Sequence, residues 1–452
     1  MTARVTIVGA GLAGTLAGVF LARRGLNVTL YERLPDLRRV ELPAGRSINL
    51  ALANRGLKPL RLAGLEPRVR PLLTAMRGRM IHHVDGALDF QPYGQRPDEV
   101  IWSVSRPGLN AMLLDAAEAA GVELRFGRRC LRADFDADRL EFADPRGRTA
   151  FVPMAPCIAA DGAGSVIRKA MMRRPGYRSS EDMLSHGYRE LSIPADPAGG
   201  HRMERNALHI WPRGGYMLIA LPNRDGSFTV TLFLPLSGEP SFASLFDAAA
   251  VRRLFESQFP DAAALMPGYE DELLAHPVGE LGTVRCRPWH VDGRALLLGD
   301  AAHAIVPFHG QGMNCAFEDC LELDGCLQAA RGEWEAAFEL FFARRQPNAE
   351  AIADMALENY VEMRDAVRDP RFRLKQAVAF ELERRFPARF VRRYSLVMFR
   401  DDVSYAEAQR RGQAQDELLE KLTEGVDDPS RVDYAAAGRL VHERLEPLGA
   451  GA

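Results

Sequence analysis

Apolar and polar positions in the first third of the chain follow two alternating periods, one typical of strands and one typical of helices. Short apolar runs are separated by longer stretches in which apolar residues recur every few positions. The predicted elements are a strand at 5–8, a helix at 16–23, a strand at 27–31, a helix at 109–120, a strand near 122–126 and a buried strand at 157–160. Strands that alternate with helices are typical of a parallel α/β layer.

The pattern changes from residue 208 onward. Three apolar runs, Leu208–Trp211, Tyr216–Leu221 and Ser227–Pro235, follow one another with only turn residues between them. Consecutive strands joined by such turns predict an antiparallel sheet.

Helix-forming residues then dominate from about 315 to about 424. We therefore predict an α/β plus α protein with a Rossmann-like nucleotide-binding domain, an inserted antiparallel-sheet domain and a C-terminal helical domain. The predicted bounds are 1–180 completed by 280–330 for the first domain, 181–279 for the second and 331–452 for the third.

A glycine motif lies between the first predicted strand and the first predicted helix. Gly9 permits the tight turn, Gly11 lets a pyrophosphate approach the backbone, and Gly14 lets the helix pack on the strand. The helix N-terminus that follows presents N–H groups and the positive end of its dipole. The motif predicts a bound anionic nucleotide, and its plainer alternative is a tight structural turn.

Glu32 completes the same unit, because it follows the predicted strand at 27–31, where a carboxylate can accept hydrogen bonds from ribose hydroxyls. A carboxylate at this position favours FAD or NAD over NADP. We add the neighbouring Arg33 and the first-turn residues Leu12 and Ala13 to the predicted cofactor contacts.

A second signature lies far along the chain. The run Ala295–Leu298 predicts a buried strand that ends at Gly299 and Asp300, and the segment Pro307–Asn314 opens a helix. The Asp300 carboxylate can accept hydrogen bonds from the ribityl hydroxyls of a flavin, while helix N–H groups can face the ring edge that becomes negative on reduction. Alternatively, Asp300 is a helix cap. Together the two signatures favour FAD.

Composition and charge argue against several other classes. The chain has 452 residues and a net charge of −2, which argues against a nucleic-acid-binding protein. We interpret the arginine pairs 384–385 and 392–393 as solvated helix faces. No stretch is apolar enough to span a membrane. The six cysteines form no CxxC pair, so we expect neither a metal site nor a redox motif. Cys315, Cys320 and Cys326 cluster on a predicted helix, where we expect buried thiols, and the expected location is the cytoplasm. The expected partner is a small molecule, with a homodimer as an open option.

Several segments resemble a known family. The motif at 9–14, Arg106, the segment 161–168 and the Gly299-Asp300 pair resemble, in order and spacing, the single-component FAD-dependent aromatic hydroxylases. The blocks that resemble the kynurenine 3-monooxygenases within that class are 45–52, 76–80, 307–314 and 357–363. The resemblance covers most of the chain. Residues 400–452 are too polar for the C-terminal membrane segment of eukaryotic members.

The resemblance implies a substrate site with a polar end and an apolar box. Arg79 and Tyr93 match positions that hold the amino-acid carboxylate, and a guanidinium suits a carboxylate bidentately. Without the resemblance, Arg79 would be interpreted as a surface arginine beside Arg77. Asn359 and Tyr394 match other substrate-facing polar positions. The positions that match the ring pocket are Leu208, Met217, Ile219, Phe233, Phe308 and Met363.

The resemblance also extends the predicted flavin contacts. Asp161 and Arg168 match a motif that the family uses around both FAD and NADPH. Arg46 and Ala51 lie in a segment expected to pass near the flavin. The other positions that match FAD contacts are Arg106, Leu131, Asp300, Gly312, Met313 and Asn314.

The implied reaction is hydroxylation of L-kynurenine at ring C3 to 3-hydroxy-L-kynurenine, with tightly bound FAD, transient NADPH, O2 and a C4a-hydroperoxyflavin. His309 and Gln311 match the loop beside the flavin and are the predicted catalytic positioning residues, with no strong general base. Two alternatives stay open. The first is the same chemistry on a substituted kynurenine or an anthranilate-like acid in secondary metabolism, and the second is a non-hydroxylating FAD-binding protein.

Overall fold

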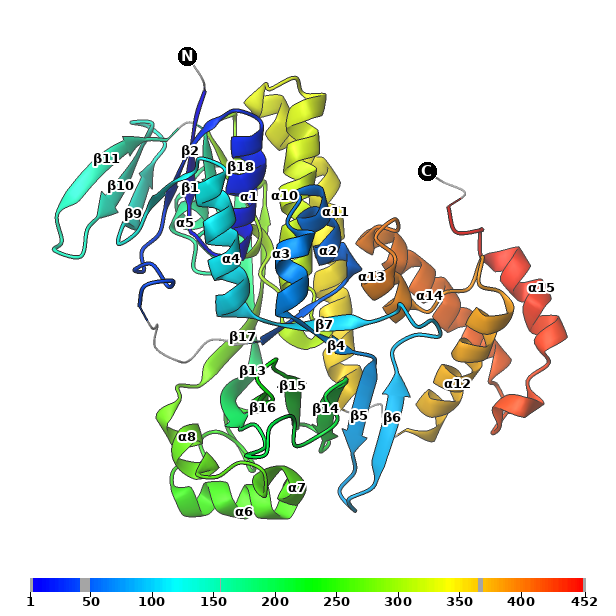
Figure 1. The fold of residues 1–452 in the computed structure, drawn as a ribbon. Helices are drawn as coiled ribbons and strands as arrows, with labels where there is room; N and C mark the ends of the chain where they lie inside the picture. Colours follow the sequence, from blue (N-terminus) through cyan, green and yellow to red (C-terminus); the bar gives the residue numbers. More distant parts are fainter. Residues whose placement is uncertain (1–2, 41–48, 155, 365–368, 450–452) are drawn as a thin grey trace.

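A computed structural model describes residues 3–40, 49–154, 156–364 and 369–449. Figure 1 shows a first sheet with its helices at the top, a second sheet below it, a group of short helices at the bottom and the C-terminal helices to one side. The α/β plus α architecture predicted from the sequence is confirmed.

The upper layer is a six-stranded sheet in the order β18-β19-β12-β1-β2-β8, parallel except for the β18–β19 pair. Its strands are β1 Arg4–Val8, β2 Asn27–Tyr31, β8 Glu123–Arg125, β12 Cys157–Ala159, β18 His290–Val291 and β19 Ala295–Leu297. The helices α1 Leu12–Arg23, α4 Arg106–Ala119 and α10 Gly312–Ala329 pack together beside it. Helix α1 begins four residues earlier than the apolar period predicted, directly after the glycine turn.

The second sheet has seven strands in the order β17-β13-β16-β15-β14-β5-β6. Its strands are β5 Gly78–His82, β6 Leu88–Pro92, β13 Arg178–Ile193, β14 Ala207–Pro212, β15 Met217–Pro222, β16 Phe228–Pro235 and β17 Gly279–Arg287. The predicted antiparallel strands are confirmed, and the structure adds that β5 and β6 join the sheet through a parallel β5–β14 pair. The predicted three-domain division remains a prediction.

The two faces of this sheet have different neighbours because alternate residues of a strand point to opposite sides. Leu218, Val230 and Leu232 face the helices α6 Ala248–Gln258, α7 Pro260–Ala263 and α8 Tyr269–Ala275. Met217 and Phe233, which are paired across two strands, face the other way. That second face meets the turn η2 Pro307–His309 and the long helix α11 Trp334–Arg364.

Two small sheets complete the strand regions. β9 Arg129–Asp134, β10 Arg139–Ala143 and β11 Thr149–Pro153 form a meander, and β3 Asn49–Leu52, β4 Leu73–Met76 and β7 Ile101–Ser105 form a second sheet in the order β3-β7-β4. The short helices between these parts are α2 Asn54–Leu62, α3 Glu66–Val69, α5 Val166–Met171 and α9 Asp300–His303.

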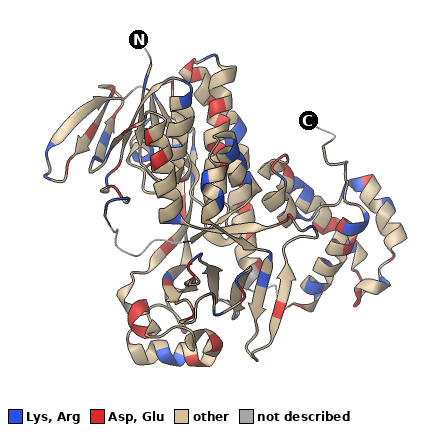
Figure 2. Cartoon of the chain, in the orientation of Figure 1, with Lys and Arg blue, Asp and Glu red and all other residues tan. Residues whose placement is uncertain are grey.

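The C-terminal part is helical, as predicted. Its helices are α12 Pro370–Arg385, α13 Arg393–Phe399, α14 Tyr405–Leu422 and α15 Tyr434–Arg444. Basic and acidic side chains are interspersed over them (Figure 2), and Arg384 and Arg385 pair with Glu381 on an exposed helix face, as expected. The same interpretation is wrong for Arg392, which is buried and pairs with Glu383. Among the described helices, none is long and apolar enough to cross a membrane.

Candidate active site

The glycine turn between β1 and α1 has the geometry that the motif predicts. Gly9 has φ +103°, and a Cβ there would lie 2.3 Å from the carbonyl oxygen of Ala160. A Cβ on Gly14 would lie 2.0 Å from the carbonyl oxygen of Gly9. By contrast, a Cβ on Gly11 would meet no atom of the described residues within 4 Å. Gly9 and Gly14 are therefore required by chain packing, while Gly11 borders open space.

The N-terminus of α1 faces the same open space. Gly11 is its N-cap residue, no side chain caps the helix, and the first-turn N–H groups of Leu12 and Ala13 have no intrahelical partner. Glu32, at the end of β2, lies beside this turn: its Oε2 accepts a hydrogen bond from the Ala10 N–H at 2.8 Å, and its Oε1 accepts one from the Leu34 N–H at 2.9 Å. The adjacent Arg33 is exposed.

Two further segments border the glycine turn. Asp161, after β12, accepts a hydrogen bond from the Val166 N–H through Oδ2, while its buried Oδ1 has no partner among the described residues. Burial raises the pKa of Asp161. The exposed Arg106 begins α4, and Asn110, one turn later on the same helix face, donates to the carbonyl of Ala10 at 3.2 Å.

Arg168 ties this region to the second signature. Its guanidinium is fully buried and donates to the carbonyl of Ala301 at 3.0 Å, to the carbonyl of Ala163 and to the Glu181 carboxylate at 2.8 Å. Arg168 thus joins the loop after β12 to α9. Its bonds are all within the chain, so the structure gives it a bracing position beside the predicted dinucleotide site.

The Gly299-Asp300 turn presents its carboxylate outward. Gly299 has φ +61°, and its N–H donates to Asp319 Oδ2 at 3.1 Å. Asp300 is exposed and makes no hydrogen bond or ion pair with the described part of the chain. Helix α9 has no side-chain cap, so the cap alternative for Asp300 is not adopted. Its carboxylate keeps its full hydrogen-bonding capacity.

The loop before α10 is braced by an asparagine. Asn314 is fully buried; its Nδ2 donates to the carbonyls of Ala51 at 2.9 Å and Gly310 at 2.8 Å, and its Oδ1 accepts from the Ala53 N–H at 2.9 Å. Asn314 therefore fixes the β3 segment against the loop with bonds inside the chain. Gly312 and Met313 begin α10, whose N-terminus has no side-chain cap.

These features fit a dinucleotide flavin. Two helix N-termini without side-chain caps offer N–H groups to anionic ligand atoms, and Glu32 and Asp300 offer carboxylates to hydroxyl groups. Leu131, on β9, is 40% exposed, which suits an apolar contact. Arg46 lies outside the described residues.

An apolar cluster lies on the sheet face opposite α6–α8. Across neighbouring strands Arg79 is paired with Leu208 and Met217 with Phe233. The predicted ring-pocket residues that this cluster brings together are Leu208, Met217, Ile219, Phe233 and Phe308. The Phe233 and Phe308 ring centroids lie 5.0 Å apart. Met363 lies in α11, and its side chain is outside the described part.

The polar end of this cluster is an arginine among aromatic rings. The Arg79 guanidinium carbon lies 4.9 Å from the ring centroid of Tyr394 and 5.8 Å from that of Tyr93. Those two tyrosines are stacked at 5.7 Å, and His309 stacks on Tyr394 at 5.5 Å. Arg79 is half-buried, its Nε is buried and without a described partner, and its neighbour Arg77 is exposed. The surface-arginine alternative for Arg79 is not adopted.

His309 is held neutral by its surroundings. Burial, together with the positive charges of Arg393, Arg79 and Arg55, lowers its pKa to about 3. Its buried Nδ1 has no partner among the described residues. A neutral imidazole with an unused ring nitrogen can donate or accept one hydrogen bond, depending on its tautomer.

Two other predicted residues use their side chains inside the chain. Asn359 Nδ2 donates to the carbonyl of Phe308 at 2.7 Å and so ties α11 to η2. Gln311 Oε1 accepts from the Tyr405 hydroxyl at 2.8 Å, and Gln311 Nε2 contacts the Met398 sulfur at 2.8 Å. Both residues border the candidate site and brace the loop that carries His309.

Known proteins identify the family. The sequence profile described as "FAD binding domain" matches residues 2–356. The chain is 50% identical over 445 residues to the kynurenine 3-monooxygenase of Xanthomonas axonopodis pv. citri, covering 98% of this chain and 97% of that protein. It is 49% identical over 446 residues to the kynurenine 3-monooxygenase of Myxococcus xanthus, covering 98% and 96%. The chain belongs to the kynurenine 3-monooxygenase family.

Solved structures support the fold of this family member. A 2-methyl-3-hydroxypyridine-5-carboxylic acid oxygenase matches with a TM-score of 0.65 at 21% identity, covering 84% of this chain and 98% of that one. The p-nitrophenol 4-monooxygenase of Pseudomonas putida matches with a TM-score of 0.65 at 19% identity, covering 84% and 94%. The chain is a flavin-dependent aromatic monooxygenase with FAD as its cofactor; NADPH and O2 are typical of the class.

Sequence reasoning missed three features of this kynurenine 3-monooxygenase family member. Tyr360 stacks on Phe308 with ring centroids 4.2 Å apart. Glu362 lies near Arg79. Burial raises the pKa of Glu362, and this effect outweighs the lowering by Arg79 and Arg393. Both lie in the block 357–363 that carried the resemblance, so their position was a usable signal. The third, the buried Arg55, carries no such signal.

One group of side chains has the composition of a metal site. Ligand atoms of His303, Cys315 and Asp319 lie within 4.8 Å of one another. His303 Nε2 bonds Asp319 Oδ2 at 2.7 Å, and Arg345 Nε bonds Asp319 Oδ1 at 2.7 Å. Burial alone would raise the pKa of Asp319, but His303 and Arg345 outweigh it and hold it at about 2. The adjacent guanidinium disfavours a further cation. All six cysteines are buried free thiols, which confirms the prediction made for Cys315, Cys320 and Cys326.

Proposed function

We propose that this chain hydroxylates L-kynurenine at ring C3, consuming NADPH and O2 and releasing 3-hydroxy-L-kynurenine and water. The identity of about 50% to kynurenine 3-monooxygenases over 98% of the chain supports this substrate. The observation that carries the proposal is the juxtaposition of one arginine, two tyrosines and a neutral histidine at the polar end of an apolar cluster.

Arg79 is the proposed carboxylate anchor. Its buried Nε has no partner among the described residues, and a buried guanidinium N–H without an acceptor is costly, so an incoming carboxylate would satisfy it. Tyr93 and Tyr394 flank the guanidinium and offer phenol donors to the same anion. An ionised Glu362 would repel the substrate carboxylate. The raised pKa of Glu362 favours its neutral, protonated form, which removes this repulsion.

The apolar cluster is proposed to hold the aminophenyl ring. Met217, Phe233 and Phe308 are buried, and Leu208 and Ile219 pack against them. A closed apolar wall fixes the ring orientation and excludes water, which would otherwise divert the reducing equivalents to hydrogen peroxide. The aniline nitrogen of the substrate activates its own ortho carbon, so the protein needs no strong base.

His309 is proposed to hydrogen-bond the substrate ketone through its unused Nδ1, directly or through water. Because burial keeps this imidazole neutral, it adds no positive charge beside the carboxylate anchor. Gln311 positions the loop through Tyr405 and Met398 rather than through a free amide.

FAD, when bound, supplies hydride acceptance from NADPH and transfer of one oxygen atom of O2 to the ring. The residues proposed to hold it are those of the glycine turn, Glu32, Asp161, Arg106, Asp300 and the N-terminus of α10. With one glycine fingerprint in the sequence, NADPH is proposed to dock transiently rather than at a second site of that type.

Anaerobic mixing of the FAD-loaded protein with NADPH, with and without L-kynurenine, tests the function. We expect the flavin absorbance to bleach faster with L-kynurenine and product analysis in air to give 3-hydroxykynurenine. A substituted kynurenine that stimulates bleaching at least as strongly as L-kynurenine would reassign the substrate. No hydroxylated product with any aromatic amino acid would remove the proposed function. The homodimer and the cytoplasmic location stay predictions, and light scattering tests the first.

A further inference from the structure

Arg55, in the short helix α2, is a fully buried cation outside the proposed substrate contacts. It is 1% exposed, and a charge at that depth is stable only if its hydrogen bonds are satisfied. Its Nε donates to the carbonyl of Val397 at 2.7 Å, and its Nη2 donates to the carbonyls of Leu396, at 3.1 Å, and Val403. Arg55 therefore gathers carbonyl groups from one short stretch of the C-terminal part.

Two of these carbonyls lie in the last turn of α13, Arg393–Phe399. The last carbonyls of a helix lack intrahelical partners and carry the negative end of its dipole, so a guanidinium there stabilises the helix. The other end of α13 is held by Arg392, whose Nη2 donates to the carbonyl of Tyr93 at 2.9 Å. This seven-residue helix carries Tyr394, which stacks on His309 and Tyr93.

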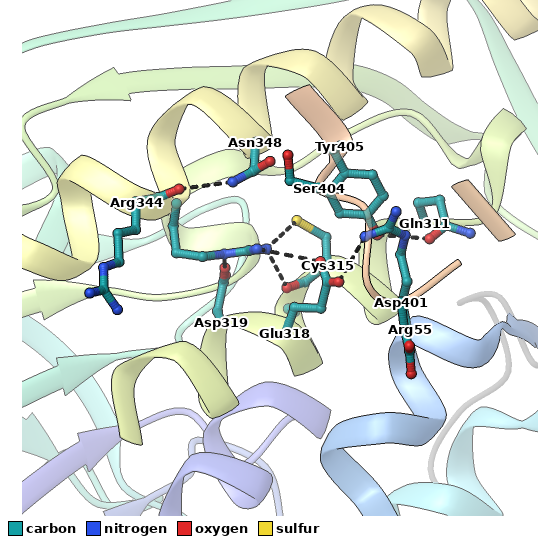
Figure 3. A network of polar contacts seen from close by, with 12 residues as sticks. Arg55, Gln311, Cys315, Glu318, Asp319, Arg344, Asn348, Asp401, Ser404 and Tyr405 are labelled. Carbon is teal, nitrogen blue, oxygen red and sulfur yellow. Dashed lines mark hydrogen bonds and ion pairs between the residues drawn. The ribbon is translucent and has the colours of Figure 1, made fainter. Parts of the chain in front are cut away.

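The Arg55 guanidinium also lies over a ring that reaches the loop beside the site. Its carbon is 4.2 Å from the ring centroid of Tyr405, and the Tyr405 hydroxyl donates to Gln311 Oε1 at 2.8 Å. Figure 3 shows Arg55, Tyr405 and Gln311 in this arrangement. One side chain thus contacts both the end of α13 and the residue that supports the His309 loop.

On its other side Arg55 is anchored to α10. Its Nη1 bonds Glu318 Oε1 at 3.0 Å, and Glu318 Oε2 pairs with Arg345 at 3.4 Å. Arg345 bonds Asp319, whose Oδ2 accepts the N–H of Gly299. Two buried arginines and two carboxylates thereby connect the C-terminal helices to the turn that presents Asp300. Figure 3 shows Arg55, Glu318 and Asp319 of this network.

We propose that Arg55 is a positioning residue that holds α13, and with it Tyr394, against the substrate site. The proposal rests on the proposed function for its kinetic consequence, since Tyr394 flanks the carboxylate anchor. Without the guanidinium, the carbonyls at the end of α13 lose their donors and Tyr405 loses its cation, so Tyr394 and the His309 loop are held less firmly. Substrate would bind more weakly, and water would reach the reacting centre more often.

Arg55→Lys tests this, because a single ammonium cannot span the positions of all four acceptors. The chain offers a matched control in Arg213, which is 7% exposed, donates to the carbonyls of Gln258, His82 and Pro212, and lies 5.1 Å from the ring centroid of Phe259. It contacts the side of the sheet that meets α6–α8. Arg213→Lys therefore reproduces the loss of a buried, carbonyl-binding guanidinium away from the site.

We expect Arg55→Lys to retain FAD, to raise the KM for L-kynurenine by roughly tenfold, the scale of one lost hydrogen bond, and to divert more NADPH to hydrogen peroxide. Arg213→Lys should lower the thermal midpoint without raising the KM for L-kynurenine or the yield of hydrogen peroxide. A KM and a peroxide yield for Arg55→Lys within about twofold of the Arg213→Lys values would overturn the proposal. Arg55→Met should show at least the defect of Arg55→Lys.

Hydrogen exchange of the FAD-loaded proteins, without substrate, separates this proposal from the proposed function. Arg55→Lys should lose amide protection in 393–405, and Arg213→Lys should not. Unchanged protection there would overturn the positioning role even if the protein hydroxylates another substrate. If Arg55→Lys does not fold, Tyr405→Phe is the second variant, because it removes only the hydroxyl bonded to Gln311. Tyr405→Phe should speed hydrogen exchange in 307–314 and raise the yield of hydrogen peroxide. The absence of both changes would count equally against the proposal.

Discussion

Replacing Arg79 by methionine removes the proposed carboxylate anchor while keeping an unbranched apolar stem beside the stacked pair of tyrosine rings. In the structure the guanidinium carbon lies 4.9 Å and 5.8 Å from the Tyr394 and Tyr93 centroids, and the buried Nε has no described partner. The substitution therefore takes away a donor for the ligand, together with the hydrogen bonds of the guanidinium to Tyr93 and Tyr394. We expect the variant to fold and to retain FAD.

The magnitude follows from the type of bond that is lost. A hydrogen bond to a charged group contributes about 1.5–3 kcal/mol. At about 1.4 kcal/mol for each factor of ten, the dissociation constant for L-kynurenine should rise by roughly one to two powers of ten. A kynurenine analogue without its carboxylate should bind the wild type and the variant about equally, because it cannot use the anchor.

The assay is a titration of the FAD-loaded protein, followed by the change in flavin absorbance. Arg77→Met is the matched control, since Arg77 is exposed and lies two residues before Arg79. It should leave the dissociation constant unchanged. If Arg79→Met binds L-kynurenine within about twofold of the wild type, or if the carboxylate-free analogue loses as much affinity as the substrate does, the assignment of Arg79 is wrong.

Three further predictions address the cofactor site and the buried histidine. Gly11→Ala should leave the apoprotein stable but weaken FAD binding, because the added Cβ meets no atom of the described chain. Gly14→Ala should impair folding, because its Cβ would lie 2.0 Å from a carbonyl oxygen; thermal midpoints and FAD titrations distinguish the two variants. Asp300→Ala should weaken FAD binding with no loss of apoprotein stability, measured in the same way, since the carboxylate has no partner within the described chain. Because burial lowers the pKa of His309 to about 3, its unfolded form takes up a proton first as pH falls. Between about pH 7.5 and 5.5 the wild type should therefore lose about 1.4 kcal/mol more stability than His309→Gln in denaturant titrations, and equal losses would refute the buried neutral state.

The parts predictable from sequence are those that depend on neighbouring residues. The turn at Gly9, the strand before it and the carboxylate of Glu32 were predicted because one βαβ unit fixes their mutual positions. Met217 and Phe233 likewise belong to consecutive strands, whose pairing follows from the short turn between them. Local order along the chain was enough to place these residues.

Residues whose partners come from distant segments were not predictable in the same way. The parallel pairing of Arg79 with Leu208 joins strands far apart in sequence, and no local period identifies a strand's partner. The sequence predicts a solvated face for Arg392 because arginines alternate with Glu and Phe in this region. In the structure Arg392 is buried, pairs with Glu383 and donates to the Tyr93 carbonyl. Arg55 lies in a polar helix pattern, and the carbonyls that satisfy it are more than three hundred residues away in the sequence.

The central claim is that this fold inserts one oxygen atom into the ring of a carboxylate-anchored aromatic amino acid. Incubation of the FAD-loaded protein with NADPH, L-kynurenine and isotopically heavy O2, followed by mass spectrometry, tests it most directly. We predict 3-hydroxykynurenine carrying one heavy oxygen atom, with most of the oxidised NADPH recovered as that product. An unlabelled product, or NADPH oxidation that yields only hydrogen peroxide, would contradict the account.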